Sequence, residues 1–186
     1  MAEAEVADIK NKTLALSIKI LIVLLAFSVL ILFIFPSWSH PIAYWQEASA
    51  ASEEFGVPVY FIYAVIKTES GFRKGAVSRK GAVGLMQVLP STYEEIKTEL
   101  GMVDGNLADP SVNIRAGTYY LSKLYKIFLD WRIALAAYNA GPGTVLKWLE
   151  ADPELADIPY PETKRYVVLV NRAYQEYTRL YSKRYQ

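Results

Sequence analysis

The most informative stretch of the chain is Pro58-Val-Tyr-Phe-Ile-Tyr-Ala-Val-Ile-Lys-Thr-Glu-Ser70, because it combines a helical pattern with an acid in an apolar setting. Pro58 is tolerated in the first turn of a helix, and Gly71 is a typical stop signal. Three apolar residues share one face of this helix with Glu69, at the spacing i, i+3, i+4 and i+7: Ile62, Val65 and Ile66. The sequence therefore predicts a helix whose last turn carries a partly desolvated carboxyl group.

Glu69 is expected to have a raised pKa for two reasons. Partial burial disfavours the charged carboxylate, and the partial negative charge at the end of a helix disfavours a further anion. A carboxylic acid that stays protonated near neutral pH can act as a general acid. The alternative is that Glu69 ends an amphipathic helix and turns into solvent, since charged side chains are rarely buried without a partner.

Apolar residues dominate the chain from Leu14 to Phe35, and residues 20–35 carry no charge. A helix rises about 1.5 Å per residue, so this run approaches the bilayer core thickness of about 30 Å. The run is longer than the apolar core of a signal peptide, and Pro36-Ser-Trp-Ser-His40 follows it where an A-x-A cleavage pattern would stand. We therefore expect an uncleaved transmembrane helix, with a signal peptide and a buried core helix as the weaker alternatives.

Basic residues set the expected orientation of this helix. Lys10, Lys12 and Lys19 lie toward its N-terminal side, and no Lys or Arg occurs between Phe35 and Lys67. By the positive-inside rule, the N-terminus stays in the cytoplasm and the bulk of the chain faces outward. The expected organisation is a cytoplasmic tail over residues 1–13, a single-pass anchor over residues 14–35 and an extracytoplasmic domain over residues 36–186.

Reactive side chains are few, which excludes most catalytic chemistries. The chain has no cysteine and a single histidine, His40, directly beyond the apolar run. A Ser-His-Asp triad, thiolate catalysis and a zinc site therefore lack their residues, and no phosphate loop or dinucleotide fingerprint occurs. The net charge of +1 offers no basic stripe for a nucleic acid. Carboxylate chemistry without a metal or cofactor remains.

Helical patterns dominate the chain beyond the anchor. A capping box is predicted at residues 91–94, and Asp109 and Asp130 are predicted N-caps. Strand signals are short, so at most a two-stranded element is expected within residues 71–88. The sequence predicts a mainly α fold, α+β at most, with helices over residues 41–55, 58–70, 91–100, 110–128, 131–140 and 144–149 and from residue 161 onward.

Two further side chains stand out as candidates for function. Glu162 lies in the first turn of the last helix, where the helix dipole favours the ionised form, so it either assists at a site or is an ordinary helix charge. The chain has 14 tyrosines, and most of them are expected to be core residues. Tyr138 is the exception, because it precedes Asn139 at a helix end followed by Ala-Gly-Pro-Gly.

Five motifs in this order closely resemble the catalytic domain of the soluble lytic transglycosylase family, and the resemblance covers the chain after about residue 42. The motifs are Glu69-Ser70-Gly71-Phe72; Gly84-Leu85-Met86-Gln87 with Pro90-Ser91-Thr92; Asn113-Ile114 with Gly117 and Tyr120-Leu121; Ala136-Ala137-Tyr138-Asn139-Ala140-Gly141; and Glu162-Thr163 with Tyr166-Val167.

The resemblance implies a lysozyme-like helical domain that cleaves the β-1,4 bond between N-acetylmuramic acid and N-acetylglucosamine in peptidoglycan. Glu69 would be the single general acid and base, and the product would carry a 1,6-anhydromuramoyl end. Two alternatives stay open. A lysozyme-type muramidase would use water and a second carboxylate, for which Glu162, Asp104 and Asp109 are candidates. A non-catalytic module would only bind the glycan strand.

The resemblance also implies a set of substrate-binding residues around Glu69. Ser70 would help to position the substrate, and the Tyr138 hydroxyl would lie near the Glu69 carboxylate. Met86 and Gln87 would line the sugar cleft. The full implied set is Ser70, Met86, Gln87, Tyr138, Asn139, Glu162 and Tyr166. The expected partners are peptidoglycan glycan strands and the membrane, without nucleic acid, metal or cofactor.

Overall fold

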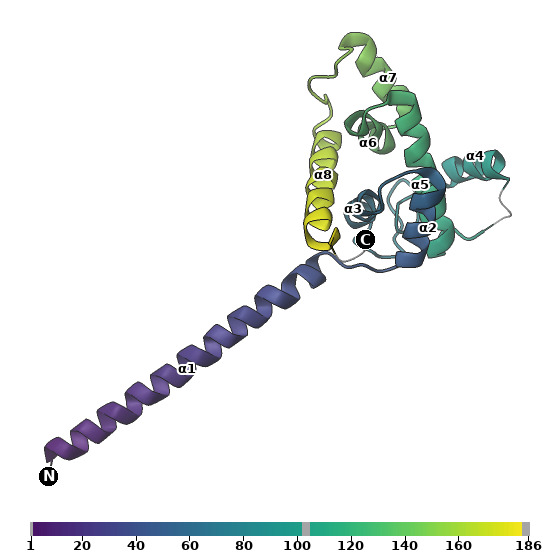
Figure 1. Cartoon of the computed structure of the whole chain (residues 1–186). Helices are drawn as coiled ribbons and strands as arrows, with labels where there is room; N and C mark the ends of the chain where they lie inside the picture. The colour runs from purple at the N-terminus through teal and green to yellow at the C-terminus, as the bar shows by residue number, and fades with distance from the viewer. Residues whose placement is uncertain (1, 102–104, 184–186) are drawn as a thin grey trace. The chain divides into compact units, whose positions relative to one another are not determined.

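The N-terminal apolar run forms one long helix, α1 (Ala2–Ser39), in the computed structural model, which describes residues 2–101 and 105–183 (Figure 1). The segment Lys12–Leu30 is long and apolar enough to cross a membrane, and none of it is buried. This helix belongs to the first of two compact units, Met1–Pro41 and Ile42–Gln186. An apolar helix without a protein covering is a candidate membrane span, which agrees with the single transmembrane helix that the sequence predicts.

Helices are the dominant regular structure of the second unit across its described residues, so the predicted mainly α class is confirmed. The predicted two-stranded element is reduced to isolated bridges, in which Val83 pairs with Val77 and with Val88. The helices are α2 (Trp45–Phe55), α3 (Val59–Glu69), α4 (Pro90–Leu100), α5 (Pro110–Phe128), α6 (Trp131–Ala140), α7 (Pro142–Ala151) and α8 (Pro161–Tyr181).

Helix α3 is the centre of this unit. Its residues 61–66 are buried on every side, as expected for a helix that is apolar all round. It packs against α2 and α8, and the rings of Tyr63 and Tyr177 stack at a centroid distance of 5.4 Å. Because α3 runs through the core, its last residue, Glu69, emerges from apolar surroundings.

Two predicted helix starts are confirmed by their capping hydrogen bonds. The carboxylate of Asp109 accepts from the Ser111 amide at 2.8 Å. The carboxylate of Asp130 accepts from the amides of Arg132 and Ile133 at 2.6 and 3.1 Å. These caps fix the first turns of α5 and α6, the two helices that carry the inner wall of the site.

Other helix boundaries differ from the prediction. The capping box at residues 91–94 is wrong, because α4 begins at Pro90 and no side chain caps it. Proline suits the first helical position, and α7 likewise begins at Pro142, earlier than predicted. Helix α2 begins only at Trp45, because Tyr44 has a left-handed backbone with φ 60°.

Candidate active site

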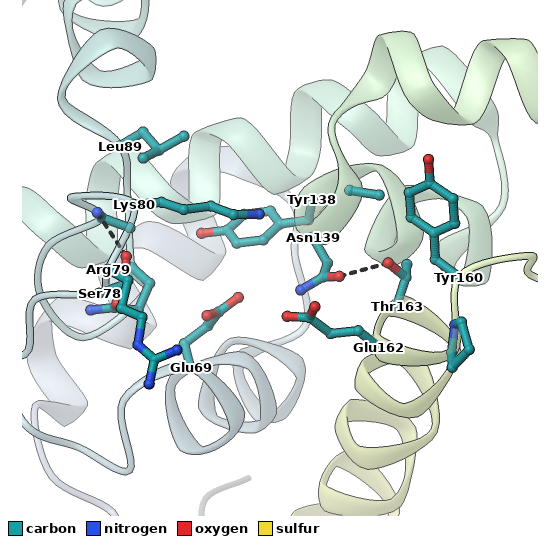
Figure 2. Close-up of a pocket in the computed structure, with 14 residues that line it drawn as sticks. Glu69, Ser78, Arg79, Lys80, Leu89, Tyr138, Asn139, Tyr160, Glu162 and Thr163 are labelled. Carbon is teal, nitrogen blue, oxygen red and sulfur yellow. Dashed lines mark hydrogen bonds between the residues drawn. The ribbon is translucent and has the colours of Figure 1, made fainter.

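Glu69 lies at the C-terminal end of α3 and lines a pocket of about 650 Å³ (Figure 2). The walls come from three places that are far apart in the sequence: the loop over residues 78–89, the end of α6 and the start of α8. An adjoining pocket of about 220 Å³ shares Gln87, Tyr138 and Asn139 with the first. Because the two pockets share these residues, they adjoin, and together they are called the groove.

Burial raises the pKa of Glu69 to about 7, which confirms the rise predicted from the sequence. The side chain is half-buried, so the charged form is only partly solvated. The Tyr166 hydroxyl acts in the opposite direction and lowers the pKa of Glu69 by offering a hydrogen bond to the carboxylate. At neutral pH the Glu69 carboxyl group is therefore able both to give and to take a proton.

The Tyr166 hydroxyl is buried and makes no hydrogen bond of ordinary geometry within the described part of the chain. Its interaction with Glu69 is therefore incomplete in this structure. Burial and the neighbouring Glu69 raise the pKa of Tyr166 well above its ordinary value, so the hydroxyl keeps its proton. The Tyr166 hydroxyl can therefore donate a stronger hydrogen bond to the Glu69 carboxylate once Glu69 becomes an anion.

Tyr138 lies beside Glu69, but its hydroxyl donates its hydrogen bond to another group. The hydroxyl donates to the Met86 carbonyl at 2.8 Å. Burial and the negative charge of Glu69 raise the pKa of Tyr138 well above its ordinary value. The effect of Glu69 on Tyr138 agrees with the closeness of the two side chains. Tyr138 also lines both parts of the groove. It therefore ties the end of α6 to the loop that forms the opposite wall.

Met86 and Ser70 do not line the groove. The Met86 side chain is fully buried and lies against Gly117 of α5. The Ser70 hydroxyl is buried and donates to the Ile66 carbonyl of α3 at 3.2 Å. The structure thus places both side chains below the surface of the site, where they support Glu69 and the loop, whereas the resemblance implied cleft-lining and substrate-positioning roles.

Gln87 lines both parts of the groove, and hydrogen bonds of its side-chain amide hold it in place. Its Nε2 donates to the Gly84 and Ala76 carbonyls at 2.8 and 3.1 Å. The backbone of Gln87 has φ 50°, a left-handed conformation that a non-glycine residue rarely adopts. The hydrogen bonds of its side chain help to hold this strained turn in place.

Asn113 is the positioning residue that sequence reasoning missed as part of the site. It is fully buried in α5, and its Oδ1 accepts from the Met86 amide at 2.7 Å. Its Nδ2 donates to the carbonyls of Val83 and Leu107, each at 2.8 Å. All three polar bonds of this amide go to loop backbone. The available signal was an asparagine on an apolar helix face, which needs buried partners.

Asn139 and Glu162 complete the far side of the groove. The Thr163 hydroxyl donates to Asn139 Oδ1 at 2.8 Å, which leaves the amide nitrogen of Asn139 for a ligand (Figure 2). Glu162 is exposed in the first turn of α8 and lines the pocket. Asp109 is an exposed N-cap that lines neither part of the groove, and Asp104 lies outside the described residues.

Comparison with known proteins gives one family. The model of the transglycosylase SLT domain matches residues 45–160. The soluble lytic murein transglycosylase of Escherichia coli (strain K12) is 35% identical over 159 residues, which is 75% of this chain and 25% of the relative. The membrane-bound lytic murein transglycosylase C of Shigella sonnei is 34% identical over 160 residues, which is 69% of this chain and 45% of the relative.

Solved structures give the same likeness. An inactive mutant of the lytic transglycosylase Slt from Pseudomonas aeruginosa has a TM-score of 0.70 at 35% identity and covers 75% of this chain. The 70-kDa soluble lytic transglycosylase of Escherichia coli has a TM-score of 0.72 at 31% identity and covers 77% of this chain. This chain spans 24% and 25% of the length of those two proteins.

Proposed function

Because the chain belongs to the transglycosylase SLT domain family, we propose that it is a membrane-anchored lytic transglycosylase of peptidoglycan. It cleaves the β-1,4 bond between N-acetylmuramic acid and N-acetylglucosamine and leaves a 1,6-anhydromuramoyl end. The observation that carries the proposal is Glu69, a half-buried acid with a pKa of about 7 in the groove. The Pseudomonas relative was made inactive by exchanging a glutamate for glutamine, which agrees with a reaction that depends on one such acid.

The reaction uses Glu69 twice. Protonated Glu69 gives its proton to the glycosidic oxygen, while the N-acetyl group of the substrate supports the positive charge that develops at C1. Ionised Glu69 then takes the proton of the C6 hydroxyl, which closes onto C1. A pKa near the working pH serves both steps, because neither protonation state is costly to reach. The Tyr166 hydroxyl stabilises Glu69 in the interval between them.

The groove has to hold the C6 hydroxyl close to C1 and to keep water away. Gln87 and Tyr138 form a wall whose position is fixed from below by Met86 and Asn113. Across the groove, the amide nitrogen of Asn139 is left as a donor toward the sugar. Such positioning replaces a bimolecular reaction with water by an intramolecular one, which is a large rate advantage.

A lysozyme-type hydrolase is the second candidate, because it would need a second carboxylate across the groove. Among the described residues that line the pocket, Glu162 is the one other acid. It is exposed at the start of a helix and could activate water. Family membership favours the transglycosylase over this hydrolase.

We also propose the topology of the chain. Residues 1–13 form a cytoplasmic tail, residues 14–35 form a single-pass anchor, and residues 36–186 form the catalytic domain on the cell-wall side. The apolar segment of α1 and the likeness to a membrane-bound transglycosylase support an anchor. The orientation rests on Lys10, Lys12 and Lys19, which all lie toward the N-terminal side.

Digestion of purified peptidoglycan, followed by mass spectrometry of the fragments, tests the proposal. The full chain should release fragments with anhydro ends, and Glu69→Gln should release none while keeping the helical circular dichroism of the wild type. Fragments with reducing ends would support the hydrolase. Binding without any fragment would support a non-catalytic module, and full activity of Glu69→Gln would exclude Glu69 as the acid.

A further inference from the structure

A tight turn over residues 78–82 presents two cations at the groove. The Gly81 amide donates to the Ser78 carbonyl at 3.0 Å, and the Ser78 amide donates to the Ala82 carbonyl at 2.9 Å. The Ala82 amide closes the turn by donating to the Ser78 hydroxyl at 3.0 Å. Arg79 and Lys80 therefore occupy the two central positions of a hydrogen-bonded turn, so their backbone is fixed.

Both cations line the pocket that holds Glu69, and Lys80 also lines the adjoining part of the groove. Figure 2 shows Arg79 on one side of Glu69 and Glu162 on the other. The groove thus has a basic edge and an acidic edge, with the acid that performs the chemistry between them. A ligand with an unevenly placed negative charge would lie in this groove in one orientation only.

The charges of Arg79 and Lys80 are uncompensated within the described part of the chain. Neither side chain makes an ion pair or a hydrogen bond there. Arg115 and Lys123 are two basic residues that do have partners: Arg115 pairs with Glu54 at 2.6 Å, and Lys123 pairs with Glu99. Two adjacent cations on a fixed turn, beside a groove and without a protein partner, are suited to an anionic ligand.

The sugar rings themselves give these cations no anion to bind. In peptidoglycan the muramic acid carries a lactyl group, and the peptide attached to it bears carboxylates on its acidic residue and at its C-terminus. We propose that Arg79 and Lys80 form a carboxylate-recognition site for this stem peptide. The inference rests on the proposed function and deepens it, because it makes the basic turn a determinant of substrate choice.

The expected effect is moderate and sensitive to salt. Both side chains are exposed, and an exposed ion pair changes binding by about two- to fivefold. Loss of both pairs should therefore raise KM about tenfold on a substrate with charged stems. The difference should shrink in about 1 M salt, where the screening length falls to about 3 Å. The value of kcat should stay unchanged, because neither cation touches the reacting atoms.

Steady-state kinetics of the full chain on three phosphate-free glycan preparations tests the proposal. The first carries intact stems, and the second carries stems with amidated and hence neutral carboxylates. The third has had its stems removed by an amidase, and the lactyl carboxylates exposed by that cleavage have then been amidated. The test variant is Arg79→Gln with Lys80→Gln. The matched control is Lys126→Gln with Lys147→Gln, which removes two exposed charges from α5 and α7 outside the groove.

The proposal expects the test variant to raise KM on the first preparation alone, while the control variant behaves as the wild type on all three. An equal loss on all three preparations would overturn it, because the turn would then act on the fold or on the sugar. No loss on any preparation would also overturn it, as would an effect that appears only when strands carrying phosphate polymers are added. Failure of the proposed function is separate, since the wild type would then cut none of the preparations.

Discussion

Two opposing effects determine the pKa of Glu69 and hence its chemistry: burial raises it, and the Tyr166 hydroxyl lowers it. Burial favours the protonated carboxyl group, which can give a proton. A strong ion pair would have the opposite effect and keep it ionised. The Tyr166 hydroxyl lies between these extremes and lowers the pKa of Glu69 only enough to leave it at about 7.

The activity should follow the titration of Glu69. The first step requires the protonated acid, so kcat/KM should fall as pH rises through about 7. Tyr166→Phe removes the donor that stabilises the anion, so this alkaline limb should move to higher pH. The pH profiles of wild type and Tyr166→Phe check both statements. A wild-type profile without an alkaline limb between pH 6 and 8, or an unmoved limb in the variant, would contradict them.

Stability should depend on pH through the same group. The folded pKa of Glu69 is raised from 4.5 to about 7, so its contribution is fully present below pH 4.5 and is lost as pH rises through 7. The loss corresponds to about 3 kcal/mol. Glu69→Gln cannot ionise and should lack this loss. Urea unfolding at pH 5 and pH 8 measures it, and equal pH dependence in both proteins would refute the assignment.

How far single residues could be predicted depends on where their partners lie. The apolar neighbours of Glu69 are in its own helix, so the spacing alone predicted its burial. The placement of Met86 could not be predicted from the sequence. Asn113, 27 residues further along the chain, determines which side of the loop faces the groove. The proximity of Tyr166 to Glu69 likewise depends on the packing of α8 against α3, two helices that lie far apart in the sequence.

At the scale of elements, α5 acts as a template for the wall of the groove. Asn113 holds the backbone of the loop, and Gly117 leaves room for Met86 beneath it. A Cβ at Gly117 would lie 2.7 Å from both Cβ and Sδ of Met86, and 3.1 Å from the Tyr138 hydroxyl oxygen. The missing side chain is therefore what allows Tyr138 to reach the Met86 carbonyl.

Gly117→Ala should disturb the site more than the fold. Met86 and Tyr138 have to shift, which we expect to cost about 1–3 kcal/mol of stability. The same shift moves the wall beside Glu69 and should lower kcat about tenfold or more. The control is Gly143→Ala in α7, where a Cβ meets nothing within 4 Å and stability should change by less than about 1 kcal/mol. Thermal unfolding measures the change in stability, and steady-state kinetics measures the change in kcat. Equal behaviour of the two variants would contradict the role of α5 in holding the wall of the groove.

Elements with local signals were predictable and those without them were not. Asp109 and Asp130 bond to amides two or three residues away, so their caps were legible in the sequence. Helix α4 begins at Pro90, before the capping box predicted over residues 91–94, because the fixed φ of proline suits the first helical position. The loop over residues 78–89 has hydrogen bonds of its own, but its position depends on α5, because Asn113 bonds to the Met86 amide and the Val83 carbonyl.

At the scale of the whole molecule, the chain combines an apolar helix with a helical domain that carries the groove. The apolar segment Lys12–Leu30 has no protein covering, so lipid is its expected environment. Its existence was predictable from composition alone. The groove was not, because its walls come from three segments that only the folded chain brings together.

Deletion of residues 1–41 should move the protein from the membrane fraction to the soluble fraction. The remaining residues, 42–186, are a compact unit of their own, so they should keep their helical content and their activity on soluble glycan fragments. Fractionation with an assay of both preparations measures this. A full chain found in the soluble fraction, or shortened at its N-terminus, would contradict the anchor.

Digestion in water enriched in oxygen-18 tests the central claim most directly, since that claim is an intramolecular closure driven by Glu69. The C6 hydroxyl supplies the new bond to C1, so mass spectrometry should find no oxygen-18 at the newly formed muramoyl ends, and Glu69→Gln should form no such ends. One labelled oxygen at each new muramoyl end would show that water attacks C1, and would contradict the account.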